Sequence, residues 1–260
     1  MFFIDVQGTL IDDTTKLPIR GAIEFIDHLN STNIPYMLIT NSTKYPSKEF
    51  LAYLNSIGLS ISASHYLDPL MVLEKHIGYD KKIAAYGSEE FLHVLEAMGY
   101  TLDFVTPDVV LIAIKEKFTH DEYAQIIEFL LGGAQLIGMH ETSLYAKNSK
   151  RYPGVGAILK MLECATSVSY SVVGKPSTAF FESALALLSH QKEGVTFGDV
   201  AIISDDVTGD IIPAQALGMH GIFVLSGKYR HAAEILPQLS VQPDVVYPDI
   251  QAVLEGLWKH

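Results

Sequence analysis

Short apolar runs alternate with amphipathic segments along most of the chain, and this alternation limits the fold more than any other feature of the sequence. Phe2–Ile4 and Tyr36–Ile39 are continuous apolar runs, as expected of strands buried on both faces. Between them, apolar residues recur at i, i+3, i+4 and i+7 from Ala22, which is one face of a helix. Strands that alternate with helices indicate a parallel sheet wound by right-handed crossovers. The sequence therefore predicts an α/β fold with a doubly wound, Rossmann-like parallel sheet.

The same alternation returns near the C-terminus and also fills the middle of the chain. We expect core strands at 200–203 and 221–225, and before them a helix that Ser177 caps. The strands and helices expected in the middle segment lie at residues 82–86, 89–98, 108–114, 120–131, 135–139 and 155–164. We therefore predict a core made of residues 1–77 and 174–260, with an α/β cap domain, residues 78–173, inserted into it.

The charge balance excludes several classes of partner. Lysine and arginine number 18 and the carboxylates 30, which gives a formal net charge of −12. A surface of this sign repels DNA, RNA and anionic membranes, so we expect no nucleic-acid partner and no membrane partner. No apolar run approaches the roughly 20 residues of a membrane helix. No signal-peptide pattern is visible either, and we expect a cytoplasmic protein.

The single cysteine, Cys164, permits no internal disulfide and no cysteine-based zinc site. It follows Met161 and Leu162 in a predicted helix, so we expect a buried, inert thiol.

Polar residues follow the predicted core strands at their C-terminal ends, where open α/β sheets bind ligands. These candidates, together with a lysine that precedes the Ser177 helix, are Asp5, Thr40, Asn41, Lys175, Asp205, Asp206 and Asp210. Carboxylates this close together repel one another unless a divalent cation neutralises them, and Mg²⁺ prefers hard oxygen ligands. A lysine with threonine and asparagine donors suits a phosphoryl group. The pattern predicts phosphoryl transfer to an aspartate, followed by hydrolysis.

Four short motifs resemble, in this order, those of the haloacid dehalogenase superfamily. They are residues 5–9 (DVQGT), 39–43 (ITNST), 174–177 (GKPS) and 204–210 (SDDVTGD). Their order and the long insert after the second resemble the class IIA phosphatases with a C2-type cap, over essentially the whole chain. The stretches 172–176 (VVGKP) and 225–230 (LSGKYR) are similar to one branch of that class. That branch includes haloacid dehalogenase-like hydrolase domain-containing protein 2 and the phospholysine phosphohistidine inorganic pyrophosphate phosphatase.

The resemblance implies a role for each candidate that handles phosphate. Asp5 is the expected nucleophile, which becomes an aspartyl-phosphate. Thr40 and Asn41 are expected to hold the phosphoryl oxygens. Lys175 is expected to neutralise Asp5 and the phosphate. The implied substrate is a small phosphorylated metabolite that residues of the cap select, and a homodimer is among the implied partners.

The resemblance also implies a Mg²⁺ site. Asp5, Asp205 and the backbone carbonyl of Gln7 are the expected ligands, and Asp206 and Asp210 are expected to support them. Dehalogenation is the less favoured chemistry, because it needs an apolar halide pocket in place of a cluster of carboxylates.

Gln7 is the departure from the family pattern that affects catalysis. Most phosphatases of this superfamily have a second aspartate there, which protonates the leaving group and later activates water. An amide cannot exchange a proton near neutral pH, and losing general acid–base catalysis costs about 10²- to 10⁴-fold in rate. Three interpretations stay open: substrates whose leaving group needs little protonation, such as phosphoramidates, acyl phosphates or activated aryl phosphates; a slow phosphatase; or a weakly active or inactive protein that binds phosphate and Mg²⁺.

Overall fold

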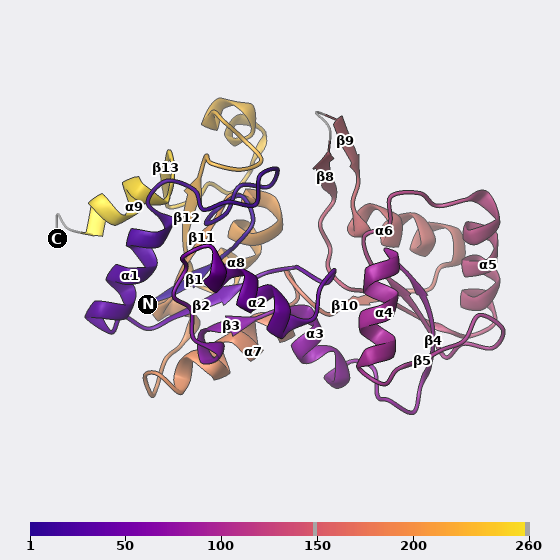
Figure 1. Cartoon of the computed structure of the whole chain (residues 1–260). Helices are drawn as coiled ribbons and strands as arrows, with labels where there is room; N and C mark the ends of the chain where they lie inside the picture. Colours follow the sequence, from indigo (N-terminus) through magenta and orange to yellow (C-terminus); the bar gives the residue numbers. More distant parts are fainter. Residues whose placement is uncertain (148–149, 258–260) are drawn as a thin grey trace. The chain divides into compact units, whose positions relative to one another are not determined.

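A computed structural model of the chain describes residues 1–147 and 150–257. The chain divides into two compact units (Figure 1). Unit 1 comprises Met1–Thr40, Lys48–Leu67 and Phe181–His260, and unit 2 comprises Asn41–Ser47 and Asp68–Phe180. Each unit contains its own parallel sheet. The assignment of residues 1–77 and 174–260 as a catalytic core and of 78–173 as a cap stays a prediction.

The sheet of unit 1 has the strand order β13-β12-β11-β1-β2-β3, and every neighbouring pair is parallel. Its strands are β1 (Phe2–Ile4), β2 (Tyr36–Ile39), β3 (Tyr66–Leu67), β11 (Ala201–Ser204), β12 (His220–Val224) and β13 (Val245–Tyr247). Its helices, two of which begin in unit 2, are α1 (Ala22–Thr32), α2 (Ser47–Ser56), α7 (Thr178–Ser189), α8 (Ile212–Ala216) and α9 (Ile250–Leu257). The order runs outward from β1 in both directions, which confirms the predicted doubly wound sheet.

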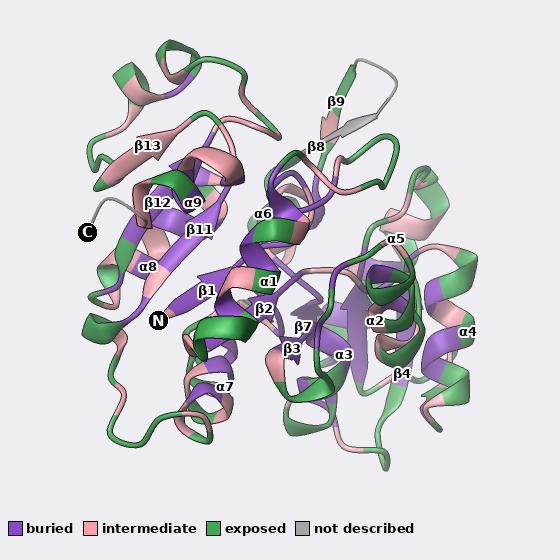
Figure 2. Ribbon diagram, turned by 60° about the vertical axis from the view of Figure 1, so that its left-hand side comes forward, coloured by how far each residue is buried: buried purple, intermediate pink, exposed green. Residues whose placement is uncertain are grey.

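Successive residues of β1 show how both faces of this sheet are covered. Phe2 meets Phe25 of α1 edge to face, with ring centroids 5.9 Å apart. Phe3 points to the other face and stacks on Phe181 of α7, at 6.5 Å. Figure 2 shows β1, β2 and β11 largely in the colour of buried residues. Burial on both faces explains why these strands are continuous apolar runs.

The helical face predicted from Ala22 is the buried face of α1. Ala22, Phe25, Ile26 and Leu29 are all inaccessible to solvent and belong to the main core of unit 1. The helix ends where Asn33 adopts a left-handed conformation (φ 53°), a common way for a helix to stop.

Unit 2 contains a parallel sheet in the order β10-β7-β6-β4-β5 and a separate antiparallel hairpin, β8-β9. The strands are β4 (Lys82–Tyr86), β5 (Thr101–Leu102), β6 (Val109–Ile112), β7 (Gln135–Gly138), β8 (Leu144–Lys147), β9 (Lys150–Pro153) and β10 (Tyr170–Val172). The helices are α3 (Pro69–Val72), α4 (Glu89–Ala97), α5 (His120–Leu131) and α6 (Val155–Thr166). The apolar faces of α5 and α6 pack on β4, β6 and β7 and form the core of this unit.

The only cysteine of the sequence does not lie where the sequence predicts. Cys164 is exposed, so the prediction of a buried thiol is wrong. Leu162 occupies the buried face of α6, and Cys164, like Met161, lies outside it.

None of the helices within residues 1–147 and 150–257 combines the length and apolar composition needed to cross a bilayer.

Candidate active site

Three strands of unit 1 end side by side and bring their following residues to one edge of the sheet. β1 lies between β11 and β2 and runs parallel to both. Asp5 follows β1, Thr40 follows β2 and Asp205 follows β11. All three residues are buried, with exposed fractions of 6%, 0% and 3%. The parallel sheet therefore gathers residues that are 200 positions apart in the chain, at the edge where open α/β sheets bind ligands.

Thr9 links the two carboxylates of this edge. Its hydroxyl donates to Asp5 Oδ2 (3.3 Å) and accepts the backbone N–H of Asp205 (3.2 Å). The turn that carries Thr9 depends on Gly8, which has a φ of +77°, a conformation that favours glycine. A Cβ at Gly8 would lie 2.3 Å from Asp205 Oδ2, so only glycine lets the backbone approach this carboxylate.

The surroundings of Asp205 disfavour its ionised form, because the nearby positive charge does not offset the effects of burial and of the neighbouring carboxylates. Burial raises its pKa well above the usual value, and the neighbouring Asp5 raises it further. The Lys228 ammonium lowers the pKa of Asp205, but by less than the other effects raise it. Two carboxylates held this close in a buried position attract a divalent cation.

Asp206 and Asp210 stabilise the backbone around Asp205. Asp206 Oδ1 accepts the N–H of Gly209 (2.9 Å) and caps the π-helical turn Val207–Ile211. Asp210 Oδ2 accepts the hydroxyl of Ser204 (2.6 Å), and that hydroxyl accepts the N–H of Asp206 (3.0 Å). Both carboxylates thus hold the turn after β11, and their support of a metal site stays a prediction.

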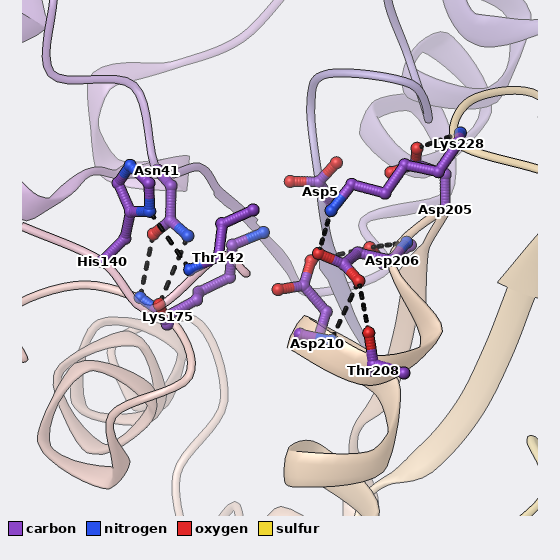
Figure 3. Close-up of polar contacts among 12 residues, drawn as sticks. Asp5, Asn41, His140, Thr142, Lys175, Asp205, Asp206, Thr208, Asp210 and Lys228 are labelled. Carbon is purple, nitrogen blue, oxygen red and sulfur yellow. Dashed lines mark hydrogen bonds and ion pairs between the residues drawn. The ribbon is translucent and has the colours of Figure 1, made fainter. Parts of the chain in front are cut away.

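Lys228 belongs to this group, and we did not predict it from the sequence. Its backbone N–H donates to Asp205 Oδ2 (2.8 Å), and its ammonium forms an ion pair with Asp206 (Figure 3). The signal that could have identified it is the stretch 225–230, which contributed to the family resemblance without a role for any of its residues.

Gln7 contacts the residue that follows β2. The hydroxyl of Thr40 donates to Gln7 Oε1 at 2.7 Å. The departure from the family pattern therefore lies at the same edge as Asp5, and its amide engages a residue predicted to bind phosphate.

Asn41 and Lys175 come together in unit 2. Asn41 Oδ1 accepts the backbone N–H of Lys175 (2.9 Å), and Asn41 Nδ2 donates to the Lys175 carbonyl (3.3 Å), as Figure 3 shows. Gly174 makes room for this pair, because a Cβ there would lie 2.6 Å from Asn41 Oδ1. Lys175 is only 2% exposed. Asn41 and Lys175 are thus hydrogen-bonded to each other, and that they act together with Asp5 stays a prediction.

The residues of unit 1 fit a magnesium ion. In the part of the chain that the structure describes, no three histidine, cysteine, aspartate or glutamate side chains form a group able to hold a metal on their own. Mg²⁺, however, is usually bound through one or two carboxylates, with water and substrate phosphate completing its shell. The buried pair Asp5 and Asp205 is such a donor set, and its mutual repulsion favours a cation.

The comparisons with known proteins identify the class to which this fold and this edge belong. The family described as haloacid dehalogenase-like hydrolase matches residues 2–101, and a second one, described as HAD-hydrolase-like, matches residues 172–253. Haloacid dehalogenase-like hydrolase domain-containing protein 2 of Mus musculus is 30% identical over 237 residues, which cover 89% of this chain and 86% of that protein. The chain belongs to the haloacid dehalogenase-like hydrolases.

Other relatives agree with this family and with the branch expected from the sequence. The phospholysine phosphohistidine inorganic pyrophosphate phosphatase of Danio rerio is 27% identical over 269 residues, 98% of this chain and 92% of that protein. Among solved structures, the p-nitrophenyl phosphatase from Archaeoglobus fulgidus matches the fold with a TM-score of 0.83 at 21% identity, over 98% of both chains. The predicted fold class is thereby confirmed, and the chain is an enzyme of the hydrolase class.

Proposed function

We propose that this protein is a Mg²⁺-dependent phosphatase that hydrolyses a small phosphorylated metabolite through an aspartyl-phosphate on Asp5. The observation that carries the proposal is the buried pair Asp5 and Asp205 at the carboxyl edge of the parallel sheet. The names of its relatives support it, since they include an acid sugar phosphatase, a 5'-nucleotidase and a phospholysine phosphohistidine inorganic pyrophosphate phosphatase.

In this proposal Asp5 attacks the phosphorus atom and the bond to the leaving group breaks. Asn41 donates a hydrogen bond to the phosphoryl oxygens, and Thr40 does so when its hydroxyl turns from Gln7 Oε1 to the phosphate. Lys175 offsets the charge of these oxygens. Water then hydrolyses the aspartyl-phosphate, which releases inorganic phosphate and restores the Asp5 carboxylate.

Asp5, Asp205 and the backbone carbonyl of Gln7 are the proposed ligands of Mg²⁺. When bound, the ion supplies positive charge that offsets both the carboxylates and the phosphate. The Thr9 hydroxyl links the Asp5 carboxylate to the backbone of Asp205 and so fixes their relative position for this role.

Gln7 indicates which substrates this site can process. Its Oε1 accepts a hydrogen bond from Thr40, so the other end of the amide is an NH₂ group, which donates hydrogen bonds. A donor of this kind stabilises a departing oxygen or nitrogen without transferring a proton to it. We therefore favour phosphoramidates, acyl phosphates and activated aryl phosphates, whose leaving groups need little protonation.

A second candidate function follows from the same residue. Without an acid at position 7, the protein can be a weakly active or inactive member of the family that binds phosphate and Mg²⁺ and acts by binding. We rank it second because relatives that match the chain over nearly its whole length are named as phosphatases.

We further propose a cytoplasmic homodimer. A cytoplasmic location agrees with the use of cysteine, because the chain has one cysteine and cannot form an internal disulfide. The homodimer rests on the family resemblance alone, and light scattering coupled to size-exclusion chromatography tests it directly.

The experiment that tests the proposed function is a substrate panel with a nucleophile variant. Acetyl phosphate, p-nitrophenyl phosphate, phosphohistidine and an alkyl phosphate are incubated with the wild type and with Asp5→Asn, with and without Mg²⁺. We expect turnover of the first three that requires Mg²⁺ and is lost in Asp5→Asn. Mg²⁺ binding without turnover of any member of the panel would favour the binding protein instead.

A further inference from the structure

His140 is a buried polar residue of unit 2, and the proposed mechanism gives it no role. It follows β7 with one residue between them, and its exposed fraction is 2%. Burying an imidazole costs free energy unless its ring nitrogens form hydrogen bonds, so an apolar side chain would suit this position better if packing were its only task. The hydrogen bonds around His140 therefore indicate what the residue does.

The main chain around His140 pairs with the main chain that leads to Lys175. β7 and β10 are parallel neighbours, and beyond their last paired residues the Gly174 N–H donates to the Met139 carbonyl (2.9 Å). Two residues after Met139, the Glu141 N–H donates to the Lys175 carbonyl (3.2 Å). These two hydrogen bonds flank His140 in the sequence, so they fix its backbone relative to that of Lys175.

The imidazole of His140 closes a short turn. Its Nδ1 accepts the backbone N–H of Thr142 at 3.3 Å, and Figure 3 marks this hydrogen bond. A ring nitrogen that accepts an N–H donor carries no proton, so the proton of the neutral ring lies on Nε2. His140 therefore acts on the turn as an acceptor, through Nδ1.

The far end of this turn is joined to the start of α6. The Thr142 carbonyl accepts the N–H of Gly156 (3.0 Å). The Ser143 carbonyl accepts the N–H of Gly154 (2.7 Å). A Cβ at Gly154 would lie 2.1 Å from the Thr142 carbonyl oxygen, so only glycine allows this approach. The turn is thus held at its end by α6 and at its start by the His140 ring.

Three hydrogen bonds hold the main chain of Lys175. Asn41 Oδ1 accepts its N–H (2.9 Å), and Asn41 Nδ2 donates to its carbonyl (3.3 Å). The third is the bond from the Glu141 N–H to the same carbonyl, and it comes from the turn that His140 closes. A lysine side chain is a flexible stem, so the position of its ammonium depends on how firmly its main chain is held.

We propose that His140 is a positioning residue for Lys175. Its Nδ1 acceptor shapes the turn so that the Glu141 N–H reaches the Lys175 carbonyl, which fixes the base of the side chain whose ammonium offsets the charge of phosphate. The inference rests on the proposed function, in which Lys175 acts on the phosphoryl group. All of these residues belong to unit 2.

The test compares two amide side chains that each replace one ring nitrogen. The Oδ1 of asparagine takes the place of Nδ1, whereas the amide of glutamine extends to the place of Nε2. His140→Asn should therefore keep the turn, and His140→Gln and His140→Leu should lose it. The control is His93→Leu, which removes an exposed histidine of α4 in the same unit. A thermal unfolding scan establishes that each variant is folded.

Two measurements report on the variants. Isothermal titration calorimetry in the presence of Mg²⁺ measures the affinity for inorganic phosphate, and amide hydrogen exchange measures the protection of the Glu141 N–H. We expect His140→Gln and His140→Leu to bind phosphate about tenfold more weakly and to exchange this amide about tenfold faster. His140→Asn and His93→Leu should match the wild type in both measurements.

The outcomes separate this inference from the proposed function. A folded His140→Gln variant with the phosphate affinity of the wild type overturns the role of His140, as does a His140→Asn variant that binds phosphate as weakly as His140→Leu. A wild type that binds phosphate but hydrolyses no phosphate compound removes the proposed function and leaves the comparison of variants valid. A wild type that binds no inorganic phosphate overturns both.

Discussion

Gln7 decides how much acid–base help the carboxyl edge of unit 1 can provide. Aspartate at this position can give and take a proton, whereas the Gln7 amide, whose oxygen accepts a hydrogen bond from Thr40, forms hydrogen bonds but transfers no proton. The rate of the enzyme should therefore depend strongly on how easily the leaving group departs without a proton.

Gln7→Asp tests this dependence. We expect the variant to raise kcat/KM for alkyl phosphates by about 10²-fold, with a smaller gain for aryl phosphates, because only poor leaving groups need the acid. The measurement is kcat/KM over a series of phosphate esters whose leaving groups have increasing pKa. Gln7→Asn, which keeps the amide, is the control. An unchanged alkyl phosphatase rate in Gln7→Asp, with Mg²⁺ binding retained, would contradict the explanation.

The sequence predicted the residues at strand ends better than those in loops. Asp5, Thr40 and Asp205 could be placed at one edge because each lies just after a buried apolar run, Asp205 with one serine between, and parallel strands end together. Lys228 could not, since it lies 23 positions after Asp205 in a loop and is one of 18 lysine and arginine residues. The structure reveals its position through its contacts with Asp205 and Asp206.

At the scale of elements, the loop after β12 depends on a glycine that is not in the left-handed region. In Gly227→Ala the new methyl group would collide with the Asp205 carboxylate, which must then move. We expect a loss of about 1–3 kcal/mol in the free energy of unfolding and weaker Mg²⁺ binding. Denaturant titration and calorimetry measure the two effects.

The control for Gly227→Ala is Gly198→Ala, where the added Cβ would meet only the Thr196 hydroxyl at 3.7 Å. Equal losses in both variants would show that the clash with Asp205 is not the cause.

In unit 2, Asp103 holds the loop between β5 and β6. The N–H groups of Thr106 and Val105 and the ammonium of Lys82 lower the pKa of Asp103 to about 2. Because the folded pKa lies below the ordinary value of 3.8, the ionised group stabilises the fold above that pH, and this contribution disappears as the pH falls through about 2.

Asp103→Asn should therefore lower the Tm at pH 7, and the difference from the wild type should close between about pH 4 and pH 2. Thermal scans across this range measure it, with Asp80→Asn, an exposed carboxylate of the same unit, as the control. A Tm difference that stays constant with pH would mean that the charge of Asp103 does not matter.

Elements with a clear apolar pattern in the sequence lie at the predicted residues, whereas the two-residue edge strands were not predicted. The structure has β1, β2, β4 and α5 at the predicted residues 2–4, 36–39, 82–86 and 120–131. The strands β3 and β5 have two residues each, too few to show a hydrophobic period, and only pairing with a neighbour defines them. The hairpin β8-β9 was missed because the sequence there has no apolar run, and in β9 Lys150 and Arg151 are exposed.

At the scale of the whole molecule, the net charge of −12 has two consequences. The negative charge disfavours anionic polymers as partners. At the same time, four of the carboxylates of the chain lie at one sheet edge and build the proposed cation site. They are Asp5, Asp205, Asp206 and Asp210. Binding of Mg²⁺ there should stabilise the folded protein, because the unfolded chain lacks the site.

At a Mg²⁺ concentration about 100 times the Kd, the expected gain is about 2.7 kcal/mol, and a chelator should remove it. Thermal scans with Mg²⁺ and with a chelator measure the shift in Tm. Asp205→Asn should abolish the shift, whereas Asp103→Asn, in unit 2, should keep it. A shift of equal size in Asp205→Asn would place the ion elsewhere.

The proposed aspartyl-phosphate is tested most directly by locating the phosphoryl group on the protein during turnover. The enzyme is mixed with acetyl phosphate and Mg²⁺, quenched in acid and digested, and the peptides are analysed by mass spectrometry. We expect a phosphoryl group on Asp5 in the wild type and none in Asp5→Asn. Turnover in which Asp5 is never phosphorylated, or an Asp5→Asn variant as active as the wild type, would contradict it.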